Sequence, residues 1–157
     1  MSVDESMPEV ESEPPGSVPE PSSHLEALGV ATHRRIQPGL CGSIMHREAG
    51  AATVVLSTSA EMGADEHGLV HGGFVFGAAD YAAMVAVNDP NVVLGAAETR
   101  FTAPARVGDA VVCSARVEAE TGRKRMVKVV CAVEGKTIME GSFTTFVLDR
   151  HVLDAGT

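Results

Sequence analysis

The chain has 157 residues, 45% of them hydrophobic, and a formal net charge of −9 at neutral pH. This length fits one domain with a sizeable core, and the acidic balance argues against a dedicated nucleic-acid binder. We expect neither a membrane span, which needs about 18 consecutive apolar residues, nor a secretory signal. The three cysteines do not suggest a disulfide framework, so the sequence predicts a cytoplasmic protein.

The first residues differ in composition from the rest of the chain. Residues 1–23 hold six acidic and no basic side chains, together with five of the eight prolines. Such a segment buries too little apolar surface to offset the entropy lost on ordering. We therefore predict a disordered acidic tail at 1–22, a single domain at 23–150 and a C-terminal tail at 151–157.

The predicted elements begin with a short helix at 23–29, which has a serine at its start and a glycine at its end. Further along, apolar and polar residues alternate, which predicts strands with one apolar face. We expect these strands at 41–48, 51–59, 92–102, 111–119, 125–134 and 137–148. The short turns between them indicate an antiparallel arrangement.

One segment breaks the strand pattern. From Gly72 to Val87 the residues are apolar on nearly every side, and the many alanines favour a helix. A helix without a polar face must be covered on most sides. The sequence therefore predicts an α+β fold in which an antiparallel sheet of five or six strands wraps around one long central helix.

Asp80 is the only charged residue in this predicted helix. A lone carboxylate is unfavourable in an apolar setting unless it is paired, hydrated or used for chemistry. It either faces a solvent gap or a hydrogen-bonding partner, or it acts as a base or nucleophile, because burial raises the pKa of a carboxyl group. We favour the functional interpretation.

His71-Gly72-Gly73 lies where the predicted helix begins. Glycines there leave the first N–H groups of the helix unobstructed, and these groups can bind a carbonyl oxygen or an oxyanion. The same glycines also suit a tight loop without any function. Asp80 lies seven residues beyond Gly73, about 10 Å along a helix, so if the two act on one substrate they should come from different subunits.

Three features, in this order, resemble the hotdog-fold thioesterases of the phenylacetyl-CoA and hydroxybenzoyl-CoA kind. These are His71-Gly72-Gly73 with Asp80 nine residues after the histidine, the segment 98–109 with its proline and Gly-Asp pair, and Gly122-Arg123 ahead of alternating valines. The resemblance covers about residues 24–150. It implies a hotdog fold for the domain.

The resemblance also implies an activity, the hydrolysis of an acyl-CoA thioester. In such enzymes the backbone N–H at the position of Gly73 polarises the thioester carbonyl, and the carboxylate at the position of Asp80, from the partner subunit, acts as nucleophile or general base. His71 shapes the loop and assists binding, and we count it among the catalytic candidates; we assign Gly72 and His67 to substrate binding. Coenzyme A is part of the substrate, so no separate cofactor is implied, and a dimer or a dimer of dimers is expected.

Two positions depart from the family pattern. Asp65 stands where the family usually has Asn or Gln, and an ionised carboxylate cannot donate a hydrogen bond. We still count Asp65 among the catalytic candidates and expect like-charge repulsion from it to raise the pKa of Asp80. Met84 replaces a frequent Ser or Thr. Asp65, His67 and His71 also suggest a metal site, but their spacing is not a standard ligand set, so no metal is predicted.

Basic residues are candidates for binding the phosphates of coenzyme A. The densest cluster lies at a predicted turn and comprises Arg123, Lys124, Arg125 and Lys128. The same cluster is typical of a solvated hairpin, and Arg100 and Arg106 are rival candidates. Cys113 and Cys131 lie on the apolar faces of two strands and are predicted to pack in the core.

Three functions remain open. Hydrolysis of an acyl-CoA is the leading hypothesis. A hotdog module that binds acyl-CoA without turnover, as a sensor or carrier, is the second, and it is favoured by the departures at Asp65 and Met84. A hydratase or dehydratase fits less well, because the Asp/His or His/Glu loop of those enzymes is not found. Thioester hydrolysis above background separates the first two hypotheses.

Overall fold

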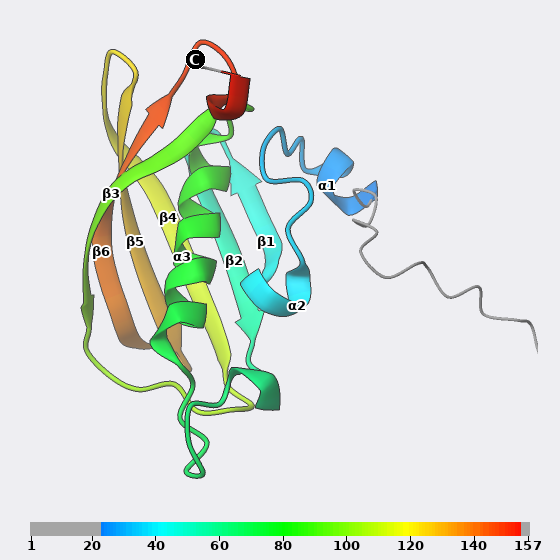
Figure 1. Ribbon diagram of the computed structural model, residues 1–157, viewed down its shortest axis with the longest axis vertical. Coiled ribbons are helices and arrows are strands. Elements are labelled where there is room, and N and C mark those ends of the chain that lie inside the picture. Colours follow the sequence, from blue (N-terminus) through cyan, green and yellow to red (C-terminus); the bar gives the residue numbers. More distant parts are fainter. Residues whose placement is uncertain (1–22, 155–157) are drawn as a thin grey trace, which may run out of the picture.

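The computed structural model describes residues 23–154, which form a six-stranded sheet with one long helix on its inner side (Figure 1). The strands are β1 (Ser43–Glu48), β2 (Ala51–Ser57), β3 (Val92–Phe101), β4 (Ala110–Thr121), β5 (Lys124–Val133) and β6 (Lys136–Val147). The helices are α1 (Ser23–Ala27), α2 (Pro38–Cys41) and α3 (Gly72–Val87), with 3₁₀ turns η1 (Ala60–Met62) and η2 (Val152–Asp154).

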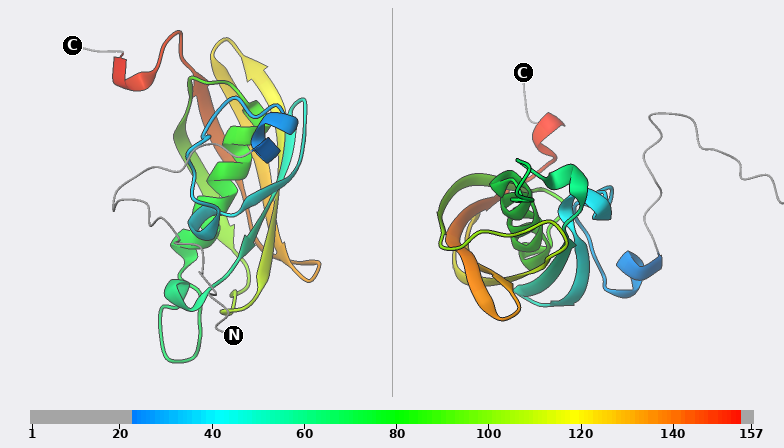
Figure 2. Two further views of the ribbon diagram at one scale, coloured as in Figure 1. Left: turned by 90° about the vertical axis from the view of Figure 1, so that its right-hand side faces the viewer. Right: turned by 90° about the horizontal axis from the view of Figure 1, so that it is seen from below.

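The sheet is antiparallel throughout, with the strand order β1-β2-β4-β5-β6-β3. It curls around α3, as the end-on view shows (Figure 2). β1 and β3 are the two edges, and neither pairs on its outer side with another strand of residues 23–154. The predicted fold class, a sheet of this kind around a central helix, is confirmed.

The inner face of the sheet and α3 share one core, because strand residues alternate between the two faces and most of those that point toward the helix are apolar. Nine residues of α3 are buried in it. Cys113 on β4 and Cys131 on β5 lie directly opposite each other, both fully buried, with their Sγ atoms 2.9 Å apart. The prediction that these two cysteines pack in the core is confirmed.

The C-terminal end of α3 is fixed by Asn88, which adopts the left-handed conformation and donates its N–H to the carbonyl of Met84 at 2.8 Å. Its side chain accepts the N–H of Ala31 at 2.8 Å and donates to the carbonyl of Gly29 at 3.0 Å. One residue therefore ends the helix and also anchors the segment that leads from α1 to α2.

The structure differs from the predicted elements in two details. The sequence predicts a strand from residue 41, but 38–41 forms the short helix α2, with Pro38 at its first position, where the missing N–H is tolerated. β1 therefore starts at Ser43. The predicted tail at 1–22 lies outside the described residues, as do 155–157, whereas Val152–Asp154 forms η2.

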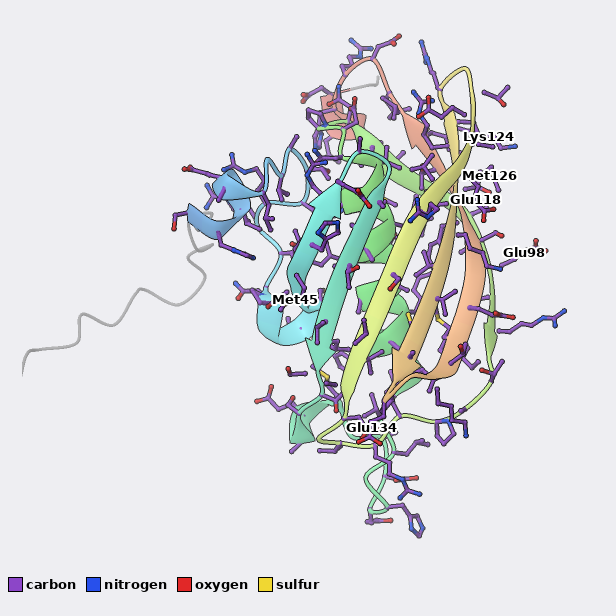
Figure 3. All side chains as sticks on the ribbon, turned by 180° about the vertical axis from the view of Figure 1, so that it is seen from behind. Met45, Glu98, Glu118, Lys124, Met126 and Glu134 are labelled. Atoms are coloured by element: carbon purple, nitrogen blue, oxygen red, sulfur yellow. The ribbon has the colours of Figure 1, made fainter. Side chains whose placement is uncertain are left out.

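The outer face of the sheet carries mainly polar and charged side chains (Figure 3). Met45 is an exception, with 62% of its surface exposed. Within residues 23–154, no helix is long and apolar enough to cross a membrane. The chemistry-bearing positions lie on the other side of the sheet, along α3 and its preceding loop.

Candidate active site

The N-terminal end of α3 offers two free backbone donors. His71 precedes the helix in an extended conformation, and its side chain does not cap the helix. Within the described part of the chain, the N–H groups of Gly72 and Gly73 have no acceptor, and Gly73 is exposed. Because the helix dipole adds positive character here, this end suits a carbonyl oxygen that gains negative charge.

The imidazole of His71 lies against Gly73. A side-chain carbon at Gly73 would come within 2.9 Å of His71 Nε2, so glycine is the residue that leaves room for the ring. The ring also packs edge-on against Phe74, with centroids 6.2 Å apart. The backbone N–H of His71 donates to the carbonyl of Met62 at 2.9 Å, which fixes the loop. These contacts fix His71 at the start of α3, and its role in the site stays a prediction.

Phe101 is a site residue that sequence reasoning missed. A side-chain carbon at Gly72 would lie 3.3 Å from Phe101 Cε1, so the ring borders the free amides. Phe101, at the end of β3, is 53% exposed, and Leu69, in the loop before α3, is 40% exposed. The two side chains give the helix start an apolar rim. The alternation in 98–101 places Phe101 on one strand face but gives no indication of what it faces.

Asp80 lies about two turns into α3 and is half-buried. Its Oδ1 is buried and has no hydrogen-bond partner among residues 23–154. Burial raises the pKa of its carboxyl group from 3.8 to about 6. The expected contribution from Asp65 is wrong for a single chain, because burial alone accounts for the direction of this shift. Asp80 is therefore poised to gain and lose a proton near neutral pH.

Cys41 is a second residue that the sequence did not reveal as part of the site. It ends α2, which packs across α3, and it is half-buried. Burial raises the pKa of its thiol, and the negative charge of Asp80 raises it further, so the two groups lie within electrostatic reach. The signal in the sequence that could have placed Cys41 is Pro38, because proline marks a helix start.

Comparison with known proteins agrees with the fold. Residues 67–138 match the family model of the thioesterase superfamily. The protein PH1136 from Pyrococcus horikoshii is 49% identical, with 80% of this chain and 96% of that chain covered and a TM-score of 0.79. A mutant of the phenylacetic acid degradation protein PaaI from Thermus thermophilus is 26% identical, with 81% and 100% covered and a TM-score of 0.64. The chain belongs to the hotdog-fold thioesterase superfamily, in its PaaI-like branch.

Two curated relatives of this thioesterase-superfamily chain carry other names. A methylthioribose-1-phosphate isomerase from Aquifex aeolicus is 46% identical over 123 residues, which are 78% of this chain but only 27% of that protein. The chain thus spans about a quarter of the isomerase, and the isomerase activity is not carried over. The transcription factor FapR from Caldanaerobacter subterraneus is 23% identical, with 87% of this chain and 70% of FapR covered.

The carboxylate of Asp65 is hydrogen-bonded to the backbone of its own loop. Its Oδ1 accepts the N–H of His67 at 2.9 Å and the N–H of Leu69 at 3.2 Å. Asp65 therefore holds the loop that leads to His71, which explains how a thioesterase-superfamily member can carry an acid here. His67 is exposed in the same loop. Among the described residues, no three His, Cys, Asp or Glu side chains are arranged to hold a metal.

The candidate phosphate-binding residues are spread over the molecule. Arg106 is exposed and lies beside Leu69, close to the start of α3. Arg100 is on β3 opposite Glu140 of β6, on the outer side of the sheet. The turn with Arg123, Lys124 and Arg125 lies at the opposite end of the sheet from the start of α3 (Figures 1 and 3).

Two of the three turn residues have partners within the chain. Arg123 forms a salt bridge with Asp149, and Arg125 Nε lies 3.4 Å from Glu120 Oε1. Arg125 also donates to the carbonyl of Gly122 at 2.6 Å. Within one subunit these side chains support the hairpin, and among the candidate basic residues Arg106 is the one that pairs with the loop before Gly73. A role for the turn in substrate binding stays a prediction that requires a partner subunit.

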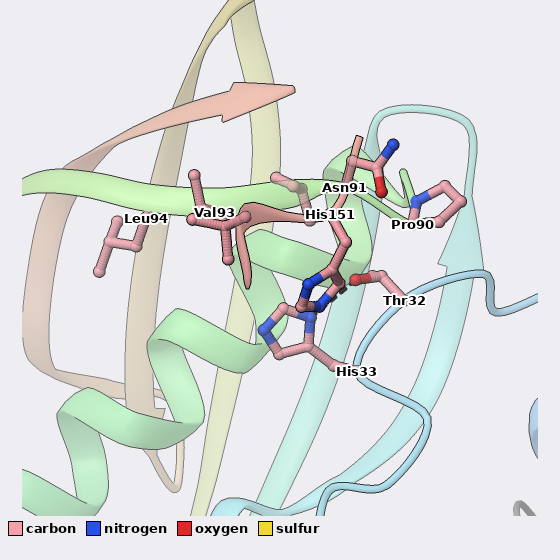
Figure 4. Close-up of a pocket in the computed structure, with 9 residues that line it drawn as sticks. Thr32, His33, Pro90, Asn91, Val93, Leu94 and His151 are labelled. Atoms are coloured by element: carbon pink, nitrogen blue, oxygen red, sulfur yellow. Dashed lines mark hydrogen bonds between the residues drawn. The ribbon is translucent and has the colours of Figure 1, made fainter. Parts of the chain in front are cut away.

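A separate cavity of about 400 Å³ lies at the C-terminal end of α3 (Figure 4). Its lining includes Thr32, His33, Asn91, Leu94 and His151. The Thr32 hydroxyl and His33 Nδ1 are hydrogen-bonded at 2.7 Å, and burial lowers the pKa of His33. Because α3 separates this cavity from Gly73, it is not part of the candidate active site.

Proposed function

We propose that the protein hydrolyses an acyl-CoA thioester to a carboxylic acid and free coenzyme A. The observation that carries this proposal is Asp80, a lone carboxylate on the central helix with a buried, unpartnered oxygen and a pKa raised to about 6. Membership of the thioesterase superfamily supports the same reaction. A carboxylate with this pKa is ionised at neutral pH and still basic enough to accept a proton.

In the proposed reaction the thioester carbonyl oxygen accepts a hydrogen bond from the N–H of Gly73, which stabilises the negative charge that develops on it. Asp80 of the partner subunit either takes a proton from the attacking water or attacks the carbonyl carbon itself, which forms an acyl–aspartyl anhydride that water then hydrolyses to release Asp80. In both cases the carbon–sulfur bond breaks, the sulfur leaves as the coenzyme A thiol after taking up a proton, and water supplies the new oxygen of the acid.

The site needs two subunits because the two groups are too far apart within one. They are separated by seven residues of a continuous helix, about 10 Å along its axis, whereas reacting atoms must approach to about 3 Å. We therefore propose a homodimer at minimum. Arg106 is the proposed contact for the phosphates of coenzyme A near Gly73, because it is exposed and lies at the same end of α3.

A test uses a panel of aliphatic and aromatic acyl-CoA substrates and measures the release of free thiol. We expect hydrolysis by the parent and its loss in Asp80→Asn. The matched control is Asp89→Asn, just beyond α3, where the amide oxygen can keep the 2.8 Å bond from the N–H of Asn91. Equal activity of parent and Asp80→Asn would contradict the proposal.

The second candidate function is acyl-CoA binding without turnover. It is favoured by the relative named as a transcription factor, FapR. It is also favoured by Met84, a fully buried thioether side chain at a position where a hydroxyl would serve the site. Under this alternative, the parent and Asp80→Asn bind acyl-CoA with similar affinity, and neither releases thiol. Calorimetry and the thiol assay together separate the two functions.

A further inference from the structure

Cys113 and Cys131 face each other across the β4–β5 ladder. They are direct partners in its register, and both side chains are fully buried on the inner face of the sheet. Cys131 donates a hydrogen bond to Cys113, with the two Sγ atoms 2.9 Å apart. Neither thiol takes part in the proposed reaction, so this pair is a reactive feature of the core that the proposed function does not explain.

Packing alone does not require sulfur at both positions. A buried cysteine behaves as a small hydrophobic side chain, and the next inner-face pair of the same ladder, Ala115 with Val129, is wholly aliphatic. Cys113 and Cys131 fill the same kind of position with two oxidisable side chains in contact. What distinguishes them from other core residues is therefore their chemistry and their position opposite each other.

The backbone geometry suits a covalent bond between the two sulfur atoms. Directly opposite residues of an antiparallel pair have Cα atoms about 4.5–5.5 Å apart, and a disulfide bridges Cα separations of about 4.4–6.8 Å. The side chains of such a pair leave the sheet on the same face, and both cysteines are buried on that face. The thiols can thus be joined without any change in the register of β4 and β5.

The folded core controls when such a bond can form. The hydrogen bond between the two thiols and the burial of the side chain raise the pKa of the Cys113 thiol, and only a thiolate attacks a disulfide. The closed sheet therefore keeps the pair protonated and inaccessible to solutes. Exchange takes place while the β4–β5 hairpin is open, during folding or local unfolding, and the closed sheet then encloses the product.

We propose that Cys113 and Cys131 are a redox modification site, a dithiol that a small disulfide such as oxidised glutathione converts to a cross-strand disulfide that stabilises the domain. One cysteine thiolate attacks the small disulfide, which forms a mixed disulfide and releases the first small thiol. The other thiolate attacks the cysteine sulfur of the mixed disulfide and displaces the second small thiol. The two cysteines lose two electrons and two protons, and the two released thiols carry both.

The bond joins the two strands at the centre of the sheet. It links residues that are 18 apart in the chain, on either side of the turn at Gly122, and it reduces the conformational freedom of the unfolded chain. In a reducing compartment the pair stays a dithiol. The stability of the domain therefore follows the thiol–disulfide balance of its surroundings, and this inference does not depend on acyl-CoA hydrolysis.

Thiol counting on the full chain tests the inference. The chain is unfolded with reductant, refolded with either reduced or oxidised glutathione, and alkylated in denaturant before mass spectrometry. Reduced glutathione should leave all three cysteines open to alkylation. Oxidised glutathione should leave Cys113 and Cys131 unalkylated, in two peptides joined by a disulfide. Alkylation of both after the oxidising refold, or glutathione bound to each, would overturn the inference.

Two variants separate this pair from the third cysteine. Cys41→Ser should form the Cys113–Cys131 bond to the same extent as the parent. Cys131→Val leaves Cys41 in α2 and Cys113 in β4, which are not partners in the ladder, and it should form no disulfide within the chain. A bond between Cys41 and Cys113 at the parental yield would show that the strand register does not direct the oxidation, contrary to the proposal.

Thermal unfolding measures the expected stabilisation on the same samples. Refolding with oxidised glutathione should raise the melting temperature of the parent by about 5–10 °C. The matched control is Cys113→Val/Cys131→Val, which keeps the core apolar and should melt at the same temperature after either refold. An equal shift in both proteins, or none in the parent, would overturn the inference.

Discussion

The loop at 63–71 and the middle of α3 both carry an aspartate, and the two are treated in opposite ways. In the loop, Asp65 is exposed and its Oδ1 accepts two backbone N–H groups. In the helix, Asp80 is half-buried, has an unpartnered oxygen and has a pKa raised to about 6. Asp65 thus stabilises its own loop, whereas Asp80 has an oxygen that is free to interact with a group outside the chain.

The difference shows where to look for chemistry in this protein. A buried polar group without a partner destabilises a fold, so its retention in a helix that is otherwise apolar points to a use outside the chain. Satisfied groups such as Asp65 instead contribute to local order. Both residues are catalytic candidates from the sequence, and the structure supports different expectations for them.

The largest effect is expected from a substitution of Asp80 in α3. In Asp80→Asn, kcat should fall by about 10²–10⁴, the usual contribution of a positioned acid or base, while acyl-CoA binding persists. Removing the burial penalty should raise the free energy of unfolding by up to about 3 kcal/mol. Steady-state kinetics and denaturant unfolding measure the two changes, and a mutant with lower stability would show that Asp80 is a structural residue like Asp65.

The pH dependence sharpens the same comparison. Below pH 6, kcat/KM of the parent should fall about tenfold per pH unit, because Asp80 must be ionised to act. The folded chain keeps a proton on Asp80 between pH 3.8 and about 6, where the unfolded chain has lost it. The free energy of unfolding should therefore decrease as pH rises through that window, relative to Asp80→Asn. Parallel curves for parent and mutant would contradict the raised pKa.

A pair of substitutions tests the loop. Asp65→Asn should keep activity and stability, because the amide oxygen can still accept the N–H groups of His67 and Leu69. Asp65→Ala removes the acceptor and should lower the free energy of unfolding by about 1 kcal/mol. Thermal unfolding and the thiol-release assay measure both variants. A folded but inactive Asp65→Asn protein would make Asp65 a catalytic participant and remove the contrast with Asp80.

The smallest effect is expected outside both regions. Deletion of residues 1–22 should leave the melting temperature and kcat/KM nearly unchanged, because this acidic, proline-rich segment has little apolar surface to pack on the domain. Differential scanning calorimetry compares the two chain lengths. A drop of more than a few degrees in the melting temperature would show that these residues contribute to the stability of the domain.

Much of this architecture was predictable from local patterns. Alternation indicated the strands, and the alanines and the absence of a polar face indicated α3, so the sheet around a central helix followed. Asp80 stood out because it is the only charge in that helix. These are properties of consecutive residues, and they need no knowledge of distant contacts.

The remaining site features depend on tertiary contacts. Phe101 borders Gly72 only because β3 returns past the start of α3, and Cys41 approaches Asp80 only because α2 packs on the helix. The partners of Arg123 and Arg125 were equally invisible. Nothing in local spacing distinguishes a basic hairpin held by Asp149 and Glu120 from one free to bind phosphates.

The central claim is that each active site combines Gly73 of one subunit with Asp80 of the partner subunit, and complementation between inactive chains tests it most directly. Asp80→Asn removes the carboxylate. Gly73→Pro removes the N–H in the first helical turn, where proline is tolerated, although His71 must move aside. Each variant alone should be dimeric, folded by circular dichroism and inactive.

The measurement is the thiol-release rate after the two variants are unfolded together and refolded. In a mixed dimer, one site regains both an intact Gly73 and an intact Asp80, so about a quarter of the parental rate per chain should return. The double variant Gly73→Pro/Asp80→Asn, refolded with Asp80→Asn, is the control and should recover nothing. Recovery to about a quarter is the result that this account predicts, and mixed dimers that remain as inactive as either variant alone would contradict it.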